Sequence, residues 1–245
     1  MNLKSKYRVL NRDIIKYFAM AAMLLNHIAN VFLTMGSPLY EALVDIGYFT
    51  AITMCYFLVE GYQYTHSKKS YGARLFLFAV ISQIPFSMAF RDHFGVGLNM
   101  IFTLFVCFLI LVVREKVQNP VLRVLLVVFL VFVTMFSDWQ LFAALFTVMF
   151  DAWRGDRKKI WLAYVIAAVS FGAMQLIGYS QFFSVQKAAV CTAGAVCGIL
   201  VSGIVIQCFY NGERAKYGRK ISKWFFYLFY PLHLTVLALL NMYWL

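Results

Sequence analysis

The sequence predicts an all-α fold: a polytopic transmembrane helix bundle. Of its 245 residues, 63% are hydrophobic and only 13% are charged, and the mean hydropathy is +0.76. A typical soluble domain is about 45–50% apolar and about 25% charged, so this composition excludes one. The apolar residues form continuous runs of about 20 residues instead of alternating with polar residues, which favours helices over a membrane barrel.

About nine such runs follow one another along the chain. A helix of about 20 residues crosses a hydrocarbon core of roughly 30 Å, so nine crossings use most of the sequence. We therefore expect a single transmembrane domain over residues 1–245, with no separate soluble domain. The predicted spans are 13–34, 43–64, 74–90, 98–113, 121–137, 139–152, 160–178, 188–210 and 223–244.

Local features support these elements in order. The first run contains Asn26-His27 and lacks a small-residue cleavage site, so we interpret it as a retained helix and not a signal peptide. The third run contains Pro85, which predicts a kink, and the fourth begins at Asn99, a residue type that caps helices. The fifth and sixth runs meet at Ser137-Asp138, and the sixth is short. These two runs are either separate spans or a re-entrant pair.

The basic residues predict the orientation, because cytoplasmic loops of membrane proteins accumulate Lys and Arg. Of the 22 Lys and Arg residues, all but Arg91 and Lys187 fall in the N-terminal tail or in every second loop. We therefore expect a cytoplasmic N-terminus and, with nine spans, a C-terminus outside. Topology and attraction to anionic lipids then account for the net charge of +12, and no nucleic-acid partner is expected.

The five cysteines all lie within predicted spans and show neither CxxC nor metal-ligand spacing. We expect no disulfide and no metal, and we expect the thiols to be buried like small apolar side chains.

A few polar side chains remain inside the predicted spans. An ionisable side chain there costs about 2.5–3.5 kcal/mol on insertion scales, so each one marks a candidate functional position. His27, beside Asn26, lies just beyond the midpoint of the first span, and its imidazole is suited to proton transfer near neutral pH. Glu60 lies near the inner end of the second span, Gln83 within the third and His233 within the last.

Each of these residues has a structural alternative. A lone histidine can hydrogen-bond between helices, Glu60 can pair with a basic residue of the next loop, and Gln83 can bond to the carbonyl that Pro85 frees. Two histidines at comparable depth favour a functional site, because facing side chains could act as an acid–base pair. A small proton-coupled transporter or channel that uses His27, Glu60 and His233 is therefore the alternative function.

Several short motifs occur together in a fixed order. They are Asn26-His27, Phe57-Leu58-Val59-Glu60-Gly61-Tyr62, Thr65, Tyr71, Arg74-Leu75, Ser82-Gln83-Ile84-Pro85-Phe86, Leu98-Asn99, Phe102-Thr103-Leu104 and Tyr230-Pro231-Leu232-His233-Leu234. In this order they resemble the TraX family of integral-membrane acyltransferases. The similarity runs through most of residues 13–104 and again through 224–240, whereas the middle spans are too generic to add to it.

The resemblance implies acyl transfer from acetyl-CoA, with N-terminal acetylation of pilus subunits as the namesake case. It also implies kinship with transmembrane acyltransferases that use a buried catalytic histidine, and His27 matches that position. Asn26 stands where many relatives have Asp, and no Arg follows Gly47 in the second span. On this basis we expect a multi-pass protein of a bacterial inner or cytoplasmic membrane.

The resemblance and the residue chemistry together suggest specific roles. His27 removes a proton from the acceptor or carries the acyl group, and Asn26 or Gln83 donates to the developing oxyanion. The acceptor is a peptide or pilin amine, an amino sugar or a glycan hydroxyl presented from outside. The residues expected to bind the acceptor are Glu60, Asn99, Tyr230 and His233. Those expected to bind the phosphates of the donor, acetyl-CoA, are Lys68, Lys69, Tyr71 and Arg74.

Overall fold

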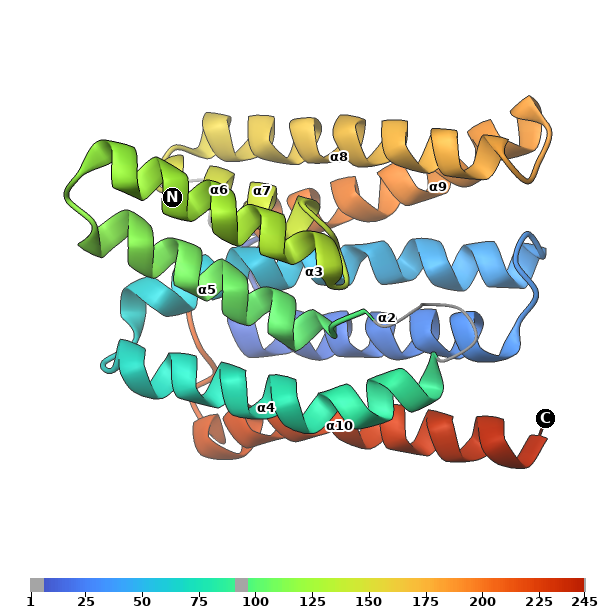
Figure 1. Ribbon diagram of the computed structural model, residues 1–245, viewed down its shortest axis with the longest axis horizontal. Helices are drawn as coiled ribbons and strands as arrows, with labels where there is room; N and C mark the ends of the chain where they lie inside the picture. The colour runs from blue at the N-terminus through green and yellow to red at the C-terminus, as the bar shows by residue number, and fades with distance from the viewer. Residues whose placement is uncertain (1–6, 91–96, 245) are drawn as a thin grey trace. The chain divides into compact units, whose positions relative to one another are not determined.

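The computed structural model describes residues 7–90 and 97–244, and the regular elements of this part are helices (Figure 1). The predicted all-α fold is confirmed. Arg91 lies outside the described residues. The elements are α2 (Arg12–Phe32), α3 (Pro38–Tyr64), α4 (Lys68–Ala89), α5 (Met100–Lys116), α6 (Pro120–Val133), η1 (Thr134–Phe136), α7 (Phe142–Ala152), α8 (Arg157–Ser180), α9 (Val185–Ile204), η2 (Val205–Phe209) and α10 (Arg219–Trp244).

Six helices of the described part are long and apolar enough to cross a membrane, which is typical of a multi-pass membrane protein. The six are α2, α3, α4, α8, α9 together with η2, and α10. The three spans expected at 98–113, 121–137 and 139–152 correspond to shorter helices, α5, α6 with η1, and α7, and whether these three cross the membrane stays a prediction. With 11 residues, α7 rises about 17 Å at 1.5 Å per residue, well short of a core of roughly 30 Å. The sides of the two termini stay predictions.

Polar caps set several of the helix boundaries. The side chain of Asn99 accepts hydrogen bonds from the first backbone N–H groups of α5, as the sequence predicted. Ser67 caps α4 by accepting from the N–H of Ser70 at 3.2 Å. The helix therefore begins at Lys68, six residues before the predicted span. Lys68, Lys69, Tyr71 and Arg74 consequently lie on the first two turns of a helix and not in a loop.

The chain forms two compact units. Within the described residues, the first unit contains residues 7–54 and 155–226, with α2, the first part of α3, α8 and α9. Helices α8 and α9 lie side by side in it (Figure 1). Helix α3 touches both α2 and α9: Thr50 Oγ1 donates to the carbonyl of Ala19 at 2.7 Å, and Thr53 Oγ1 lies 2.7 Å from Ser202 Oγ. This part of α3 is therefore bonded to both α2 and α9 within the first unit.

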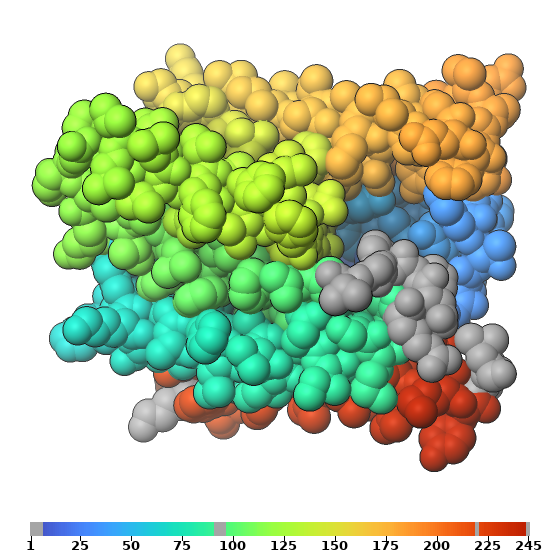
Figure 2. All heavy atoms as spheres, viewed as in Figure 1, coloured from blue at the N-terminus to red at the C-terminus, as the bar shows by residue number. Residues whose placement is uncertain are grey.

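The second unit contains residues 55–154 and 227–244 of the described chain. Its central helix is α5, which packs against α4, α6 and α7. Helix α6 has no buried residue, and the space-filling view shows this yellow-green segment at the surface (Figure 2). Its exposed side chains are apolar, among them Leu125, Val128 and Phe129, so lipid is the environment that suits this helix.

The expectation for the cysteines is only partly correct. Cys55, Cys107 and Cys191 are buried, whereas Cys197 and Cys208 are exposed. An exposed position in an apolar helix faces lipid, where a thiol costs little, so hydropathy alone does not separate the two environments.

Candidate functional site

In the first unit, the predicted catalytic histidine lies on the second half of α2. The side chain of His27 is buried, with a relative exposure of 7%. Its neighbour Asn26 donates from Nδ2 to the carbonyl of Val44 on α3 at 3.3 Å. Asn26 Oδ1 accepts from Asn30 Nδ2 at 3.1 Å, and Asn30 Oδ1 accepts from the hydroxyl of Tyr40 at 3.0 Å. A chain of polar contacts thus fixes the amide beside the histidine.

Gly47 of α3 allows α2 to approach closely at this point. A Cβ atom at position 47 would lie 2.3 Å from Asn26 Cβ and 2.5 Å from Asn26 Nδ2. Carbon atoms pack at about 3.5–4.0 Å, so a larger residue here would displace the amide. The missing side chain at Gly47 therefore sets the position of Asn26.

A second polar cluster of this unit was missed in the sequence. Glu41, which is 9% exposed, accepts hydrogen bonds from the hydroxyl of Tyr179 at 2.8 Å and from the N–H of Gly36 at 3.1 Å. One turn later, Asp45 packs against Gly194, and its Oδ1 atom is buried without a hydrogen-bond partner in the described part of the chain. Two carboxylates four residues apart beside an apolar run were the available signal. The predicted start at residue 43 had placed Glu41 in a loop.

In the second unit, the structure brings together three of the predicted site residues, Gln83, Asn99 and Tyr230. Asn99 is fully buried, and its Nδ2 donates to Gln83 Oε1 at 2.8 Å and to the carbonyl of Ala79 at 2.7 Å. The hydroxyl of Tyr230 accepts from the N–H of Met100 at 3.3 Å.

The amide group of Gln83 is fully engaged in this network. Its Nε2 donates to the carbonyl of Gly97 at 2.9 Å and to Ser87 Oγ at 3.2 Å. An amide nitrogen has two N–H groups, so both are used. Gln83 therefore holds the start of α5, and the oxyanion role stays a prediction that requires an exchange of one bond.

His233 lies one turn after Phe229 on α10 and is 7% exposed. Its Nδ1 is 2.7 Å from the carbonyl oxygen of Phe229, and its ring stacks on the Phe229 ring with centroids 4.8 Å apart. A carbonyl oxygen only accepts, so Nδ1 carries the proton and Nε2 of a neutral ring is the acceptor. The acceptor-binding role of His233 stays a prediction.

At the other end of the second unit, the predicted donor-binding residues lie at the start of α4. Lys68 Nζ pairs with Glu115 at 2.6 Å, and the hydroxyl of Tyr62 also donates to this carboxylate. The bond from Lys68, followed by that from Tyr62, lowers the pKa of Glu115 below its ordinary value of 4.5. The guanidinium of Arg74 lies 5.9 Å from the ring centroids of both Tyr71 and Tyr227.

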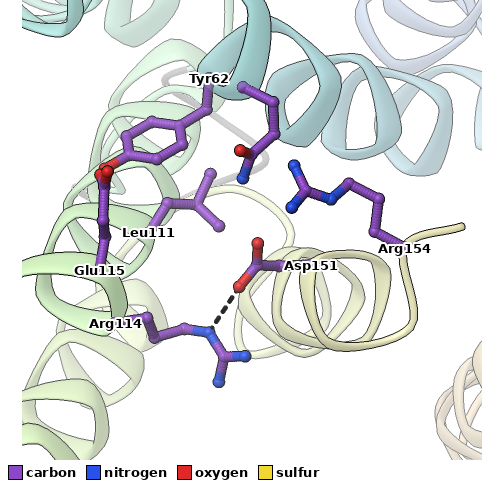
Figure 3. Close-up of a pocket in the computed structure, with 7 residues that line it drawn as sticks. Tyr62, Leu111, Arg114, Glu115, Asp151 and Arg154 are labelled. Carbon is purple, nitrogen blue, oxygen red and sulfur yellow. Dashed lines mark hydrogen bonds and ion pairs between the residues drawn. The ribbon is translucent and has the colours of Figure 1, made fainter.

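The end of the second unit that holds the start of α4 also contains charged groups that the sequence analysis had explained only by membrane orientation. Arg114 Nε pairs with Asp151 Oδ2 at 2.8 Å, and both line a pocket together with Arg154 (Figure 3). Glu60 is partly buried near the C-terminal end of α3, and Lys69 is exposed on the first turn of α4. The sequence offered no signal that separates Arg114 and Arg154 from ordinary loop charges, because the pocket depends on which helix ends meet in space.

Comparison with known proteins assigns the chain to a family. A family model described as TraX protein matches residues 11–241. The chain belongs to the TraX family. It is also 32% identical over 243 residues to the probable fimbrial assembly protein FimC, serogroup H1, of Dichelobacter nodosus. That match covers 94% of this chain and 95% of the relative. No solved structure matches the chain.

The TraX match includes both compact units and every candidate site residue described above. Asn26 and His27 belong to the first unit. The remaining predicted residues belong to the second unit: Glu60, Lys68, Lys69, Tyr71, Arg74, Gln83, Asn99, Tyr230 and His233.

Proposed function

We propose that this TraX-family protein is a membrane-embedded acyltransferase of a bacterial cytoplasmic membrane. It moves the acetyl group of cytoplasmic acetyl-CoA to an amine or hydroxyl presented from the outer side. The observation that carries the proposal is a 7%-exposed histidine, His27, next to an amide fixed by Val44 and Asn30 within an apolar helix. Buried ionisable groups in such helices are costly, which favours a functional role. The similarity to a probable fimbrial assembly protein supports a pilin or another peptide as the acceptor.

In the proposed reaction, the acceptor nitrogen or oxygen attacks the carbonyl carbon of the thioester, and neutral His27 Nδ1 or Nε2 takes its proton. The carbon–sulfur bond then breaks, and the proton passes from the imidazolium to the departing CoA thiolate. Transient transfer of the acetyl group to His27 is the covalent variant. An α-amino group titrates near pH 8 and needs little help from a base, whereas a hydroxyl needs much more.

Asn26 is the candidate donor to the oxyanion in this mechanism. Its amide nitrogen uses one N–H for the carbonyl of Val44, which leaves the second N–H available in the described structure. Loss of one such donor costs a factor of about 10²–10³ in rate in enzymes that stabilise an oxyanion.

The test uses purified protein, radiolabelled acetyl-CoA and cell fractions from a deletion strain, with mass spectrometry of the labelled product. His27→Ala should abolish labelling. His66→Ala, which removes an exposed histidine outside both candidate sites, should retain it. Full activity of the His27→Ala protein would exclude His27 as the base, and a wild-type protein that binds CoA without labelling any fraction would contradict acyl transfer.

A further inference from the structure

A pocket of about 240 Å³ lies at the end of the second unit where α3, α5 and α7 terminate (Figure 3). It is lined by Tyr62, Gln63, Leu111, Arg114, Glu115, Asp151 and Arg154. Pockets for whole drug-sized ligands measure roughly 300–1,000 Å³, so this one has room for part of a larger molecule. The predicted orientation places it on the cytoplasmic side.

The two carboxylates of the pocket are already neutralised. Lys68 Nζ lies 2.6 Å from both oxygens of Glu115, and Tyr62 donates to the same group. Asp151 is paired with the Nε atom of Arg114. The lining residues and Lys68 therefore carry one more positive than negative charge.

The excess charge lies on the arginines. Figure 3 shows the guanidinium groups of Arg114 and Arg154 on opposite sides of Asp151. Arg114 uses Nε for its ion pair, so its two Nη groups keep their donors for another partner. Arg154 makes no ion pair or side-chain hydrogen bond with the described residues, although it lines the pocket. A guanidinium group with unused N–H donors binds a phosphate monoester in a bidentate manner, so each of the two arginines is a candidate phosphate ligand.

The rest of the lining fits a purine base. The carboxamide of Gln63 makes no hydrogen bond to the described part of the chain, and Leu111 adds an apolar wall. A carboxamide can donate to N7 and accept from the N6 amino group of adenine at the same time. The pocket thus combines a group that recognises adenine with a pair of groups that bind phosphate.

We propose that this pocket binds the adenosine 3′-phosphate end of the acyl-CoA donor, with Arg114 and Arg154 on the phosphate and Gln63 on the base. This inference rests on the proposed function and adds three residues to the expected donor site. Lys68 remains part of the site through Glu115, which it keeps from repelling the phosphate. Lys69 is exposed on the first turn of α4 and is not among the residues that line the pocket.

The phosphate could also belong to an anionic lipid headgroup, which shares the chemistry that arginine recognises. Binding of adenosine 3′,5′-bisphosphate and of CoA is therefore measured by titration calorimetry with the full chain in nanodiscs. One set of nanodiscs contains phosphatidylcholine only, and the other also contains phosphatidylglycerol. Competition by phosphatidylglycerol that abolishes nucleotide binding would overturn the nucleotide assignment and identify a headgroup site.

The decisive variant is Arg154→Gln, because Arg154 has no ion pair to lose with any residue that the structure describes. Its affinity for both ligands should fall about tenfold or more, the usual loss for a charge-assisted hydrogen bond. The matched control is Arg123→Gln on α6, which neutralises another arginine of the same unit outside the pocket. Its affinity should stay within about twofold of wild type, since a single distant charge is screened. Equal effects of the two variants would overturn the site.

A third variant tests the base contact. Gln63→Leu should weaken adenosine 3′,5′-bisphosphate but leave the affinity for ribose 3,5-bisphosphate unchanged, and equal losses for both would refute the contact to adenine. The controls also separate this inference from the proposed function. Wild-type protein that binds CoA with no dependence on Arg154 removes only the pocket, whereas wild-type protein that binds no CoA contradicts both.

Discussion

The most direct test of how α2 and α3 position the proposed catalytic group is Gly47→Ala. The added methyl carbon would lie 2.3 Å from Asn26 Cβ, so at least about 1 Å of separation must be gained to reach van der Waals distance. Overpacking of this kind costs about 1–3 kcal/mol, against which alanine gains up to about 1 kcal/mol of helix propensity. We expect a net loss of about 1–2 kcal/mol in the free energy of unfolding.

The loss of activity should be larger than the loss of stability. Displacement of a catalytic constellation by about 1 Å can reduce a rate by about 10²-fold, and His27 is adjacent to the displaced residue. The assay is acetyl transfer in nanodiscs, measured together with thermal unfolding of the same preparation. Retained activity in a protein that is shown to be destabilised would refute the link between Gly47 and the reacting groups.

The matched control is Gly178→Ala on α8, a helical glycine of the same unit. No atom outside its own helix lies within 4 Å of the Cβ position at residue 178. This substitution should stabilise the protein by up to about 1 kcal/mol and leave transfer unchanged. If Gly47→Ala and Gly178→Ala behave alike within about threefold in rate, steric displacement is not the cause and the 10²-fold expectation fails.

Three further outcomes are expected. Asn99→Ala removes the cap of α5 together with the side-chain bonds to Gln83 Oε1 and to the Ala79 carbonyl, although the N–H of residue 99 still donates to Gln83 Oε1. The loss should be about 2–4 kcal/mol by thermal unfolding, and a loss below about 0.5 kcal/mol would contradict this. Thr53→Val should cost about 1 kcal/mol and Ser202→Ala less, because Thr53 keeps its bond to the Phe49 carbonyl in the second variant; the reverse order would be inconsistent with these bonds. The N–H groups of Lys159 and Lys158 hold the pKa of Asp156 below its ordinary value of 3.8. The contribution of Asp156 to stability is therefore present above about pH 4 and is lost as the pH falls through the lowered pKa. Asp156→Asn keeps the cap, so the melting temperature of this variant should fall less than that of wild type between about pH 6 and pH 3.

The sequence predicted the helical class and the approximate position of each helix because both depend on local features. Continuous apolar runs require backbone hydrogen bonds within each segment, and Asn99 stands where a cap is needed. Hydropathy alone did not separate the six helices long enough to cross a membrane from the three shorter ones, because it measures how apolar a run is and not how far it rises. The turn at Ser137, held by the N–H of Leu98 bonding to the Phe136 carbonyl at 2.9 Å, leaves only 11 residues for α7.

The candidate site was predicted only where single residues were out of place in the membrane. His27, Gln83 and His233 could be found in this way, and the structure confirms that His27 and His233 are buried. The pocket between α3, α5 and α7 could not be found, since it depends on which helix ends meet in space. Arg114 and Arg154 lie 40 positions apart in the sequence and, taken one at a time, have the appearance of ordinary loop charges.

The amide at position 26 has a chemical consequence for the proposed reaction. A carboxylate beside His27 would accept a hydrogen bond from a ring N–H and strengthen the ring as a base. An amide held by the Val44 carbonyl instead offers an N–H, which stabilises negative charge on a thioester oxygen. Strong base activation is needed for a hydroxyl acceptor and not for an α-amine, which is substantially neutral near pH 8. The residue at position 26 therefore favours an amine, such as a peptide N-terminus, as the acceptor of this chain.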